Sequence, residues 1–282
     1  MTDDDITLQQ AADALGVHYM TAYRYVRHGQ LEARKVDGEW RVSPAALTAF
    51  RAGTESGSRR PRAGRGVRSA PWAERMEARL VAGDATGAWG VVEAAMAAGA
   101  TPDRVYTEVI SPALVSIGDR WAAGDLDIAS EHRATAVVQR LIGRLGPQFG
   151  RRGRTRGVVV VGAPAGETHA LVVSMLADLL RGEGWEVSDL GADVPPESFV
   201  SAAEAVDPVA VVISVTATAC LPAAAQACST LHVIRPDTPI VLGGRAVVDE
   251  QAARDLGADA FSGDVDALVA LLAGFSGASR TA

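Results

Sequence analysis

Hydrophobic and polar positions follow three different patterns along the chain, and each pattern predicts a different kind of domain. From residue 157 onward, near-continuous apolar runs (GVVVVGAPA, WEVSDLGA, PVAVVISVT and PIVLGG) alternate with segments of helical length. Buried strands that alternate with helices are typical of a parallel sheet wrapped by helices. Residues 151–276 are therefore predicted to form a doubly wound α/β domain, and residues 277–282 a disordered tail.

In residues 72–150 the apolar positions recur at three- and four-residue spacing, which predicts a four-helix bundle. The third helix is expected to begin at Thr101-Pro102 and to bend at Pro112, which lies inside its apolar pattern. Its predicted stripe, at four-residue spacing, consists of Val105, Val109, Ala113, Ile117 and Trp121. The multidomain chain thus joins an all-helical domain to an α/β domain.

Residues 1–51 combine short helices with a hairpin signal. The signals are, in chain order, a Thr7–Gln10 capping box, helices ending near Leu15 and His28, a hairpin turn at Asp37-Gly38, and a helix start at Ser43-Pro44. Two helices at this spacing, followed by a hairpin, predict a winged helix-turn-helix. Residues 52–71 hold five arginines against one glutamate among Gly, Ser and Pro, and are predicted to be a flexible linker.

Charge and composition narrow the possible partners. The net charge is −7, yet residues 1–70 carry eleven basic and eight acidic side chains, so a polyanion would bind this N-terminal quarter. The chain contains no apolar run of about 18 residues, so a membrane span is not expected. The acidic N-terminus lacks the apolar core of a signal peptide, which favours a cytoplasmic protein. The two cysteines, Cys220 and Cys228, are predicted to be small buried residues.

The predicted winged helix-turn-helix offers side chains that suit double-stranded DNA. Ala22 and Val26 are expected to face the first helix. The candidate DNA contacts are Thr21, Tyr23 and Arg24 toward a major groove, Arg27 toward a phosphate, and Lys35 and Arg41 on the hairpin. The spacing resembles the DNA-binding units of MerR-type regulators and excisionases. The alternative is an interaction module with ordinary solvated arginines. Because one such unit reads few base pairs, DNA binding would require a dimer or larger assembly on a repeated operator.

A candidate metal ligand follows the first strand of the α/β domain. Glu167 and His169 stand two residues apart in the loop APAGETHALVV, at the carboxyl end of a strand, where open parallel sheets bind ligands. The imidazole can ligate a metal while the carboxylate fixes its tautomer. The alternative is a helix-capping or surface histidine.

This loop and two later segments resemble the cobalamin-binding domain, a flavodoxin-like fold whose motif is Asp/Glu-x-His-x-x-Gly. In that family the histidine, here His169, replaces the cofactor's benzimidazole as the lower cobalt ligand, and the displaced tail enters the sheet. Two further landmarks match: Ser214-Val215-Thr216, whose serine can bond the tail, and Gly243-Gly244, which leaves room for it. The terminal glycine of the motif is Val172 here.

The stretch WAAGDLDIASEH contains Trp121 and, after nine intervening residues, Glu131 and His132. Glu131 continues the apolar stripe of the fourth helix and needs a partner if buried; the alternative is a solvated first turn beside an exposed histidine. The spacing resembles CarH-type light-dependent repressors. That resemblance implies that Trp121 covers the upper corrin face, Glu131 bonds the adenosyl group and His132 supports the pocket. Well-known members have histidine where this chain has Ala122, so water or another histidine takes that cobalt position, or this photochemistry is not used.

The resemblance covers nearly the whole chain in the same domain order. It implies a non-enzymatic transcriptional regulator, a repressor, that binds adenosylcobalamin (a cobalt cofactor) between bundle and α/β domain. Light would break the cobalt–carbon bond and change both the homo-oligomer, a dimer or tetramer, and DNA binding. The alternatives are a light-independent regulator that senses another cobalamin form or another ligand, a corrinoid carrier protein for methyl transfer, and an interaction module with structural histidines.

Overall fold

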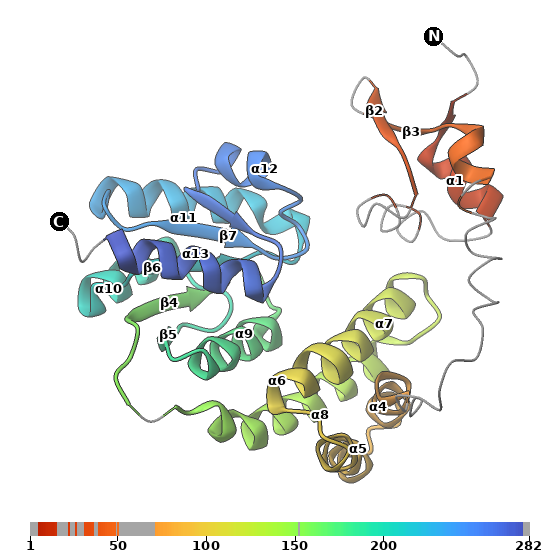
Figure 1. Cartoon of the computed structure of the whole chain (residues 1–282), viewed down its shortest axis with the longest axis horizontal. Helices are drawn as coiled ribbons and strands as arrows, with labels where there is room; N and C mark the ends of the chain where they lie inside the picture. Colours follow the sequence, from red (N-terminus) through yellow and green to blue (C-terminus); the bar gives the residue numbers. More distant parts are fainter. Residues whose placement is uncertain are drawn as a thin grey trace, which may run out of the picture. The chain divides into compact units, whose positions relative to one another are not determined.

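The structure is a computed structural model. It describes residues 5–15, 22, 26, 31–36, 39–48, 50, 71–151 and 153–278. The chain divides into two compact units, residues 1–68 and 69–282, and each unit is described by itself. Figure 1 gives the element labels.

The N-terminal unit contains a small antiparallel sheet against a short helix. Its elements are β1 (Ile6–Thr7), α1 (Leu8–Leu15), β2 (Arg34–Val36) and β3 (Glu39–Val42). The predicted capping box is confirmed: the Gln10 N–H donates to Thr7 Oγ1 at 3.2 Å, and the Thr7 N–H donates to Gln10 Oε1 at 2.9 Å. Strands β2 and β3 form the predicted hairpin, and β1, which the sequence pattern missed, pairs with β3.

The core of this unit joins α1 to the segment after it. Ala22 is buried and Val26 packs partly buried in the same cluster as Leu8, which confirms that both face the first helix. The Ala46 N–H donates to Ser43 Oγ at 3.1 Å and residues 44–48 are helical, as the Ser43-Pro44 signal predicts. The remainder of the predicted second helix and the Asp37-Gly38 turn lie outside the described residues.

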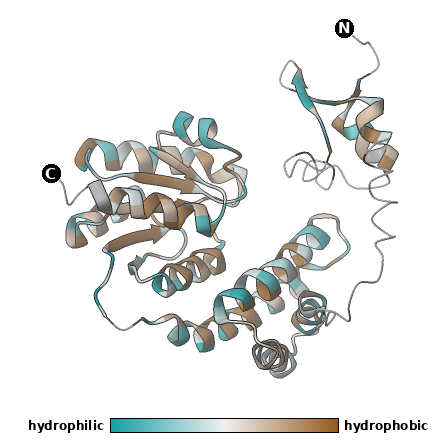
Figure 2. Cartoon of the chain, viewed as in Figure 1, coloured by the Kyte–Doolittle hydropathy of each residue, from teal (hydrophilic) through white to brown (hydrophobic). Residues whose placement is uncertain are grey.

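Residues 72–145 form the predicted bundle. Its elements are α4 (Trp72–Val81), α5 (Ala85–Ala97), α6 (Pro102–Arg104), η1 (Val105–Ile110), α7 (Ser111–Ala122) and α8 (Ile128–Leu145). Apart from the three-residue α6, the helices contribute apolar faces to a shared core, with polar residues outward, as the two-coloured helices in Figure 2 show.

The third helix of the bundle is irregular near the predicted bend. It begins after Thr101, in the capping position, but the Thr101 side chain makes no capping bond. Its middle, η1, is π-helical and ends just before Pro112, at the start of α7. Proline lacks an N–H, so the hydrogen-bond ladder must be rearranged in the preceding turn. The apolar stripe is buried as far as Ile117, whereas Trp121 is 48% exposed.

The C-terminal part is a five-stranded parallel sheet. Its strands are β4 (Val158–Gly162), β5 (Glu186–Asp189), β6 (Ala210–Ser214), β7 (Ile240–Gly243) and β8 (Ala260–Ser262). The spatial order is β5-β4-β6-β7-β8, the flavodoxin-like order of the predicted doubly wound fold. The short strand β8 was not predicted. The prediction of a buried strand was wrong for β5, because this edge strand has only exposed and half-buried positions.

Helices cover both faces of the sheet. They are α9 (Ala170–Gly182), α10 (Pro196–Val206), α11 (Leu221–Ile234), α12 (Glu250–Asp255) and α13 (Val265–Ala278), with 3₁₀ turns η2 (Gly146–Phe149) and η3 (Thr218–Cys220). Helices α9 and α13 pack on one face, and α10, α11 and α12 on the other. The tail prediction was wrong at its start: α13 continues to Ala278 because its apolar residues pack on the sheet, and residues 279–282 lie outside the described residues.

Two further predictions concern the cysteines and membrane-spanning helices. Cys220 and Cys228 are buried and unpaired, as predicted, and burial raises the pKa of the Cys228 thiol to about 12. In the part of the chain that the structure describes, every helix is too short or too polar to span a lipid bilayer.

Helix α9 connects the sheet to the bundle. Met175 and Leu179 on this helix belong to the bundle's hydrophobic core. Tyr106 in the π-helical segment donates its hydroxyl to Asp178 Oδ2 at 2.8 Å, and this bond is buried. Burial, and then the bond to Asp178, raises the pKa of Tyr106, so the phenol stays protonated and acts as donor. One helix therefore packs on the sheet and also belongs to the bundle core.

We predict that Tyr106→Phe lowers the free energy of unfolding by about 1.5–3 kcal/mol, the usual contribution of a hydrogen bond to a charged group. The variant keeps the ring and removes only the hydroxyl that reaches Asp178. Urea unfolding measures the change. Thr107→Val is the matched control, because it removes an exposed hydroxyl bond to the Asp103 carbonyl in the same segment and should change stability by less than about 0.5 kcal/mol. Equal stability of Tyr106→Phe and wild type would contradict this account of the junction.

Candidate functional site

The candidate site lies where the strand order of the sheet reverses. Strand β4 leads into α9 on one face, and its neighbour β6 leads into α11 on the other. The loops that follow two such strands diverge, and open α/β sheets bind ligands between them, at the carboxyl ends of the strands. The loop after β4 carries Glu167 and His169, and the loop after β6 begins at Val215.

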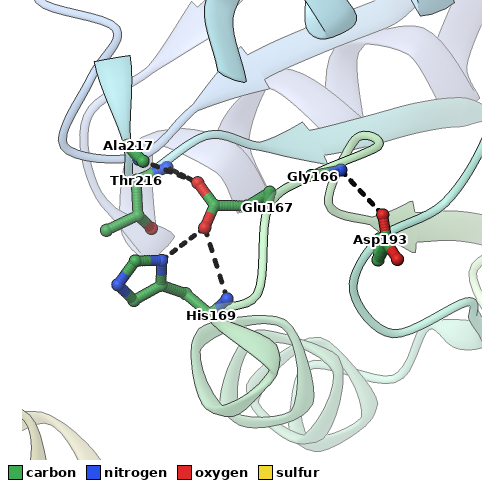
Figure 3. Close-up of polar contacts among 6 residues, drawn as sticks. All are labelled: Gly166, Glu167, His169, Asp193, Thr216 and Ala217. Atoms are coloured by element: carbon green, nitrogen blue, oxygen red, sulfur yellow. Dashed lines mark hydrogen bonds and ion pairs between the residues drawn. The ribbon is translucent and has the colours of Figure 1, made fainter. Parts of the chain in front are cut away.

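Glu167 is held at both carboxylate oxygens, although its side chain is only 1% exposed. Oε2 accepts hydrogen bonds from the backbone N–H groups of Thr216 and Ala217, each at 2.8 Å, and Oε1 contacts Nδ1 of His169 (Figure 3). Burial alone would raise the pKa of Glu167, but the hydrogen bonds from His169, Ala217 and Thr216 outweigh it and lower the pKa. Glu167 is therefore an ionised carboxylate at neutral pH.

His169 occupies the capping position of α9, but its side chain does not bond the helix N-terminus. Its Nδ1 pairs with Glu167, and its side chain is 50% exposed. An ionised carboxylate at Nδ1 favours the tautomer with the proton on Nδ1, which leaves the Nε2 lone pair available. The pair thus has the arrangement of a histidine ligand with its supporting carboxylate, while ligation of a metal by His169 stays a prediction. A single nitrogen ligand suits a metal that a macrocycle already holds.

The remaining landmarks lie at the same edge of the sheet. Ser214 ends β6 and is in register with Gly243 at the end of β7. A Cβ atom on Gly243 would lie 2.6 Å from the Ser262 carbonyl oxygen, and one on Gly244, whose φ is +99°, would lie 2.4 Å from that of Val215. These glycines therefore allow strands and loops to approach each other. The reason predicted from sequence, room for a cofactor tail, stays a prediction.

Val172 stands in the first turn of α9 and is 40% exposed. Its neighbour Leu171 packs against the bundle core. The fold therefore tolerates valine at the position of the motif's glycine, and the side chain stays outside the core.

The bundle side of the candidate site contains a second carboxylate–imidazole pair. In the first turn of α8, Glu131 accepts hydrogen bonds from Thr135 Oγ1 at 2.9 Å and from His132 Nδ1 at 2.6 Å. Glu131 thus has the partners that its position requires, and its side chain is 30% exposed against 71% for His132. Trp121 and Ala122 are both exposed at the end of α7.

An ion pair joins the two sides of the site. Arg245, which follows Gly244, donates to Asp119 Oδ1 on α7 at 3.0 Å. The end of α7 that carries Trp121 is therefore next to the carboxyl edge of the sheet. Neither partner was predicted, because nothing in the sequence links residues 126 positions apart.

Asp193 is a further residue that the sequence interpretation missed. It follows β5 and accepts a hydrogen bond at Oδ1 from the Gly166 N–H at 2.7 Å (Figure 3). Its position after a strand that neighbours β4 is the one signal that could have indicated it, since the carboxyl ends of parallel strands meet at one edge.

The predicted DNA contacts are only partly described. Thr21, Tyr23, Arg24 and Arg27 lie outside the described residues. Lys35 is exposed on β2 opposite Trp40, and Arg41 lies on β3, so both are on the hairpin where a wing is predicted. Their contact with DNA stays a prediction.

Comparison with known families finds matches to the N-terminal unit and to the bundle and α/β domain. A helix-turn-helix domain model matches residues 6–54. Two models of the B12 binding domain match residues 72–145 and 157–272, which together exceed half of the chain.

Individual relatives include a transcriptional repressor and corrinoid proteins. The HTH-type transcriptional repressor CarH of Myxococcus xanthus is 31% identical over 198 residues, which cover 69% of this chain and 65% of that protein. Trimethylamine corrinoid protein 1 of Methanosarcina acetivorans is 27% identical over 176 residues, 61% of this chain and 81% of that protein. The structure of the Methanosarcina barkeri monomethylamine corrinoid protein has the same fold, with a TM-score of 0.60 at 20% identity over 70% of this chain and 95% of that one. Because a helix-turn-helix domain precedes both B12 binding domains, the chain belongs to the CarH-type family of cobalamin-binding DNA regulators.

Proposed function

We propose that this regulator carries adenosylcobalamin between its bundle and its α/β domain, and that light controls its binding to an operator. The observation that supports this most strongly is the Glu167–His169 pair, which presents Nε2 at the carboxyl edge of the sheet. The Asp119–Arg245 ion pair supports the same location, because it brings α7 next to that edge. The ligand and the predicted lid, Trp121, thus come from the two domains.

The residues present fit cobalamin on both sides. His169 would bind cobalt from below, oriented by Glu167, while Ser214, Thr216, Gly243 and Gly244 would border the displaced tail. Trp121 would cover the upper face with its half-exposed ring, Glu131 would hydrogen-bond the adenosyl group, and His132 would support the pocket. Glu131 already binds two partners, but a carboxylate has about four acceptor positions, so it retains capacity for another hydrogen bond.

Bound adenosylcobalamin supplies a cobalt–carbon bond that visible light breaks. The chain's own part is to make contacts, through Trp121 and Glu131, that exist only while the adenosyl group is attached. Their loss changes the relative free energies of two bundle arrangements, which is the requirement for a ligand to shift an equilibrium. A homo-oligomer, dimer or tetramer, that depends on the dark arrangement would then dissociate and lose the affinity that comes from linked DNA-binding units. On this proposal the protein acts in the cytoplasm as a repressor and catalyses no reaction.

The test compares dark and illuminated protein. The full chain is loaded with adenosylcobalamin in darkness and its mass is measured by light scattering before and after green light. Duplex DNA selected from a random library by the dark protein is then titrated in both states. We expect a larger dark oligomer and weaker DNA binding after light. The same mass and DNA affinity in both states, with cobalamin bound, would contradict light control. The protein would then be a light-independent cobalamin sensor, an interpretation favoured by Ala122, which stands where well-known members have histidine.

The second candidate function is a corrinoid carrier for methyl transfer. It is favoured by the identity with trimethylamine corrinoid proteins across 61% of the chain. The helix-turn-helix match at residues 6–54 favours the regulator instead. Methyl transfer from methylcobalamin on this protein to a thiol acceptor, without selection of any DNA sequence, would support the carrier.

A further inference from the structure

We infer that Asp193 is a positioning residue for the cobalt ligand, acting through the turn that carries Glu167. This inference rests on the proposed function, because it concerns how His169 is directed toward bound cobalamin. It is carried by the way the β5–α10 connection lies along the loop after β4.

Pairing between the two segments continues beyond the strands themselves. Strand β5 ends in register with β4. Beyond it, the Ala163 N–H donates to the Gly191 carbonyl, and the Val194 N–H donates to the Ala163 carbonyl, both at 2.9 Å. Pro164 and Val194 form a further parallel bridge. The β5–α10 connection is therefore attached to the histidine loop from its start.

Asp193 holds the tip of this loop at two points. Residues 164–167 form a turn, closed by a bond from the Glu167 N–H to the Pro164 carbonyl at 3.0 Å, with Gly166 at φ +80°. The Asp193 carboxylate accepts the Gly166 N–H at 2.7 Å, and the Asp193 N–H donates to the Glu167 carbonyl at 2.9 Å. Figure 3 shows Asp193 on the side of the turn opposite His169.

The backbone of Asp193 is strained in the way this double contact requires. Its φ is +57°, a left-handed conformation that aspartate adopts more readily than most residues other than glycine. Such conformations persist where surrounding contacts hold them and are concentrated at functional sites. In this conformation Asp193 directs both its N–H and its carboxylate at the same turn.

The consequence is that Glu167 is fixed through its backbone as well as its side chain. Thr216 and Ala217 hold its carboxylate, and Asp193 holds its carbonyl and the preceding amide. The direction of Nε2 depends on both attachments. Partners that orient a metal ligand typically change metal affinity by about 10- to 100-fold when removed, and we expect the lower end, about tenfold, for a group one contact further away.

The test removes the side chain while preserving backbone freedom. Asp193→Gly permits positive φ but has no carboxylate, whereas Asp193→Asn keeps an acceptor oxygen. Each full-length variant, with ¹⁵N-labelled histidine, is loaded with cob(II)alamin, whose unpaired electron couples to the axial nitrogen. Coupling to labelled histidine gives doublets in the electron paramagnetic resonance spectrum, and coupling to the cofactor's own unlabelled benzimidazole gives triplets.

We expect a mixed spectrum and about tenfold weaker binding for Asp193→Gly, with near-normal behaviour of Asp193→Asn. Asp207→Gly is the matched control, because Asp207 is the other non-glycine residue with positive φ in the described part of the chain and ends α10 away from the loop. Thermal unfolding of each apo variant separates lost stability from lost positioning. Pure doublets and unchanged affinity in Asp193→Gly would overturn the inference. Triplets in the wild type would instead overturn the proposed histidine ligation itself.

Discussion

Cobalamin loaded onto the His169→Ala variant should keep its own benzimidazole on cobalt. The affinity of this variant for cobalamin should fall further than in a variant that loses only a partner of the ligand, where the decrease is about 10- to 100-fold. The reason is that the ligand itself is removed. Alanine has no lone pair, and Glu167 beside it cannot substitute, since its carboxylate is buried and held by Thr216 and Ala217. Titration followed by cobalamin absorption measures the affinity.

His132→Ala is the matched control for this variant. His132 is also an exposed imidazole paired through Nδ1 with a carboxylate, but it belongs to the bundle. Its removal should leave the lower coordination unchanged and weaken only the binding of forms with an adenosyl group. If the roles are exchanged, so that His132→Ala alone releases histidine from cobalt, the assignment of the two pairs is wrong.

Replacing Glu167 should separate stability from ligation. In Glu167→Ala, the half-buried N–H groups of Thr216 and Ala217 lose their acceptor. An unsatisfied donor costs about 1–3 kcal/mol when it is fully buried, so for two half-buried donors we expect the free energy of unfolding in urea to fall by about 2 kcal/mol. Cobalamin affinity should fall about 10- to 100-fold, because His169 loses the group that fixes its tautomer.

Glu167→Gln sharpens the test. The two backbone donors require the amide oxygen, which turns the amide NH₂ toward His169 Nδ1. Nδ1 must then accept, so the proton moves to Nε2 and the cobalt ligand is lost. We expect most of the stability to return without the ligation. Glu131→Gln, at the second carboxylate–imidazole pair, should change neither the free energy of unfolding nor the ligation of cobalt by histidine. Full histidine ligation in Glu167→Gln would refute the tautomer argument.

Much of the fold was predictable because long elements repeat their hydrophobic pattern. The bundle helices followed from the spacing of their apolar residues and four strands of the parallel sheet from apolar runs, while the β2–β3 hairpin and the capping box at Thr7 and Gln10 were visible as local signals. Strands β1 and β8 were missed because two or three residues show no period. The exposure of β5 depends on its place at the edge of the sheet, which no local pattern encodes.

The candidate site was predictable only as far as its residues lie close in sequence. The pairing of Glu167 with His169 was predicted from their spacing of two, whereas the contact between Glu131 and His132 was not predicted, because adjacent residues on a helix do not normally face each other. The amides that hold Glu167 are 49 and 50 residues away, and they act through the backbone, so their side chains give no signal. Asp193 and the Asp119–Arg245 pair depend likewise on the order of the strands and on the docking of the bundle.

The most direct measurement is the electron paramagnetic resonance spectrum of the wild-type protein, loaded with cob(II)alamin after ¹⁵N labelling of its histidines. The account predicts doublets, because a protein imidazole occupies the lower position on cobalt. Triplets from the unlabelled benzimidazole would contradict it, and would leave Glu167 and His169 as a structural pair within the regulator.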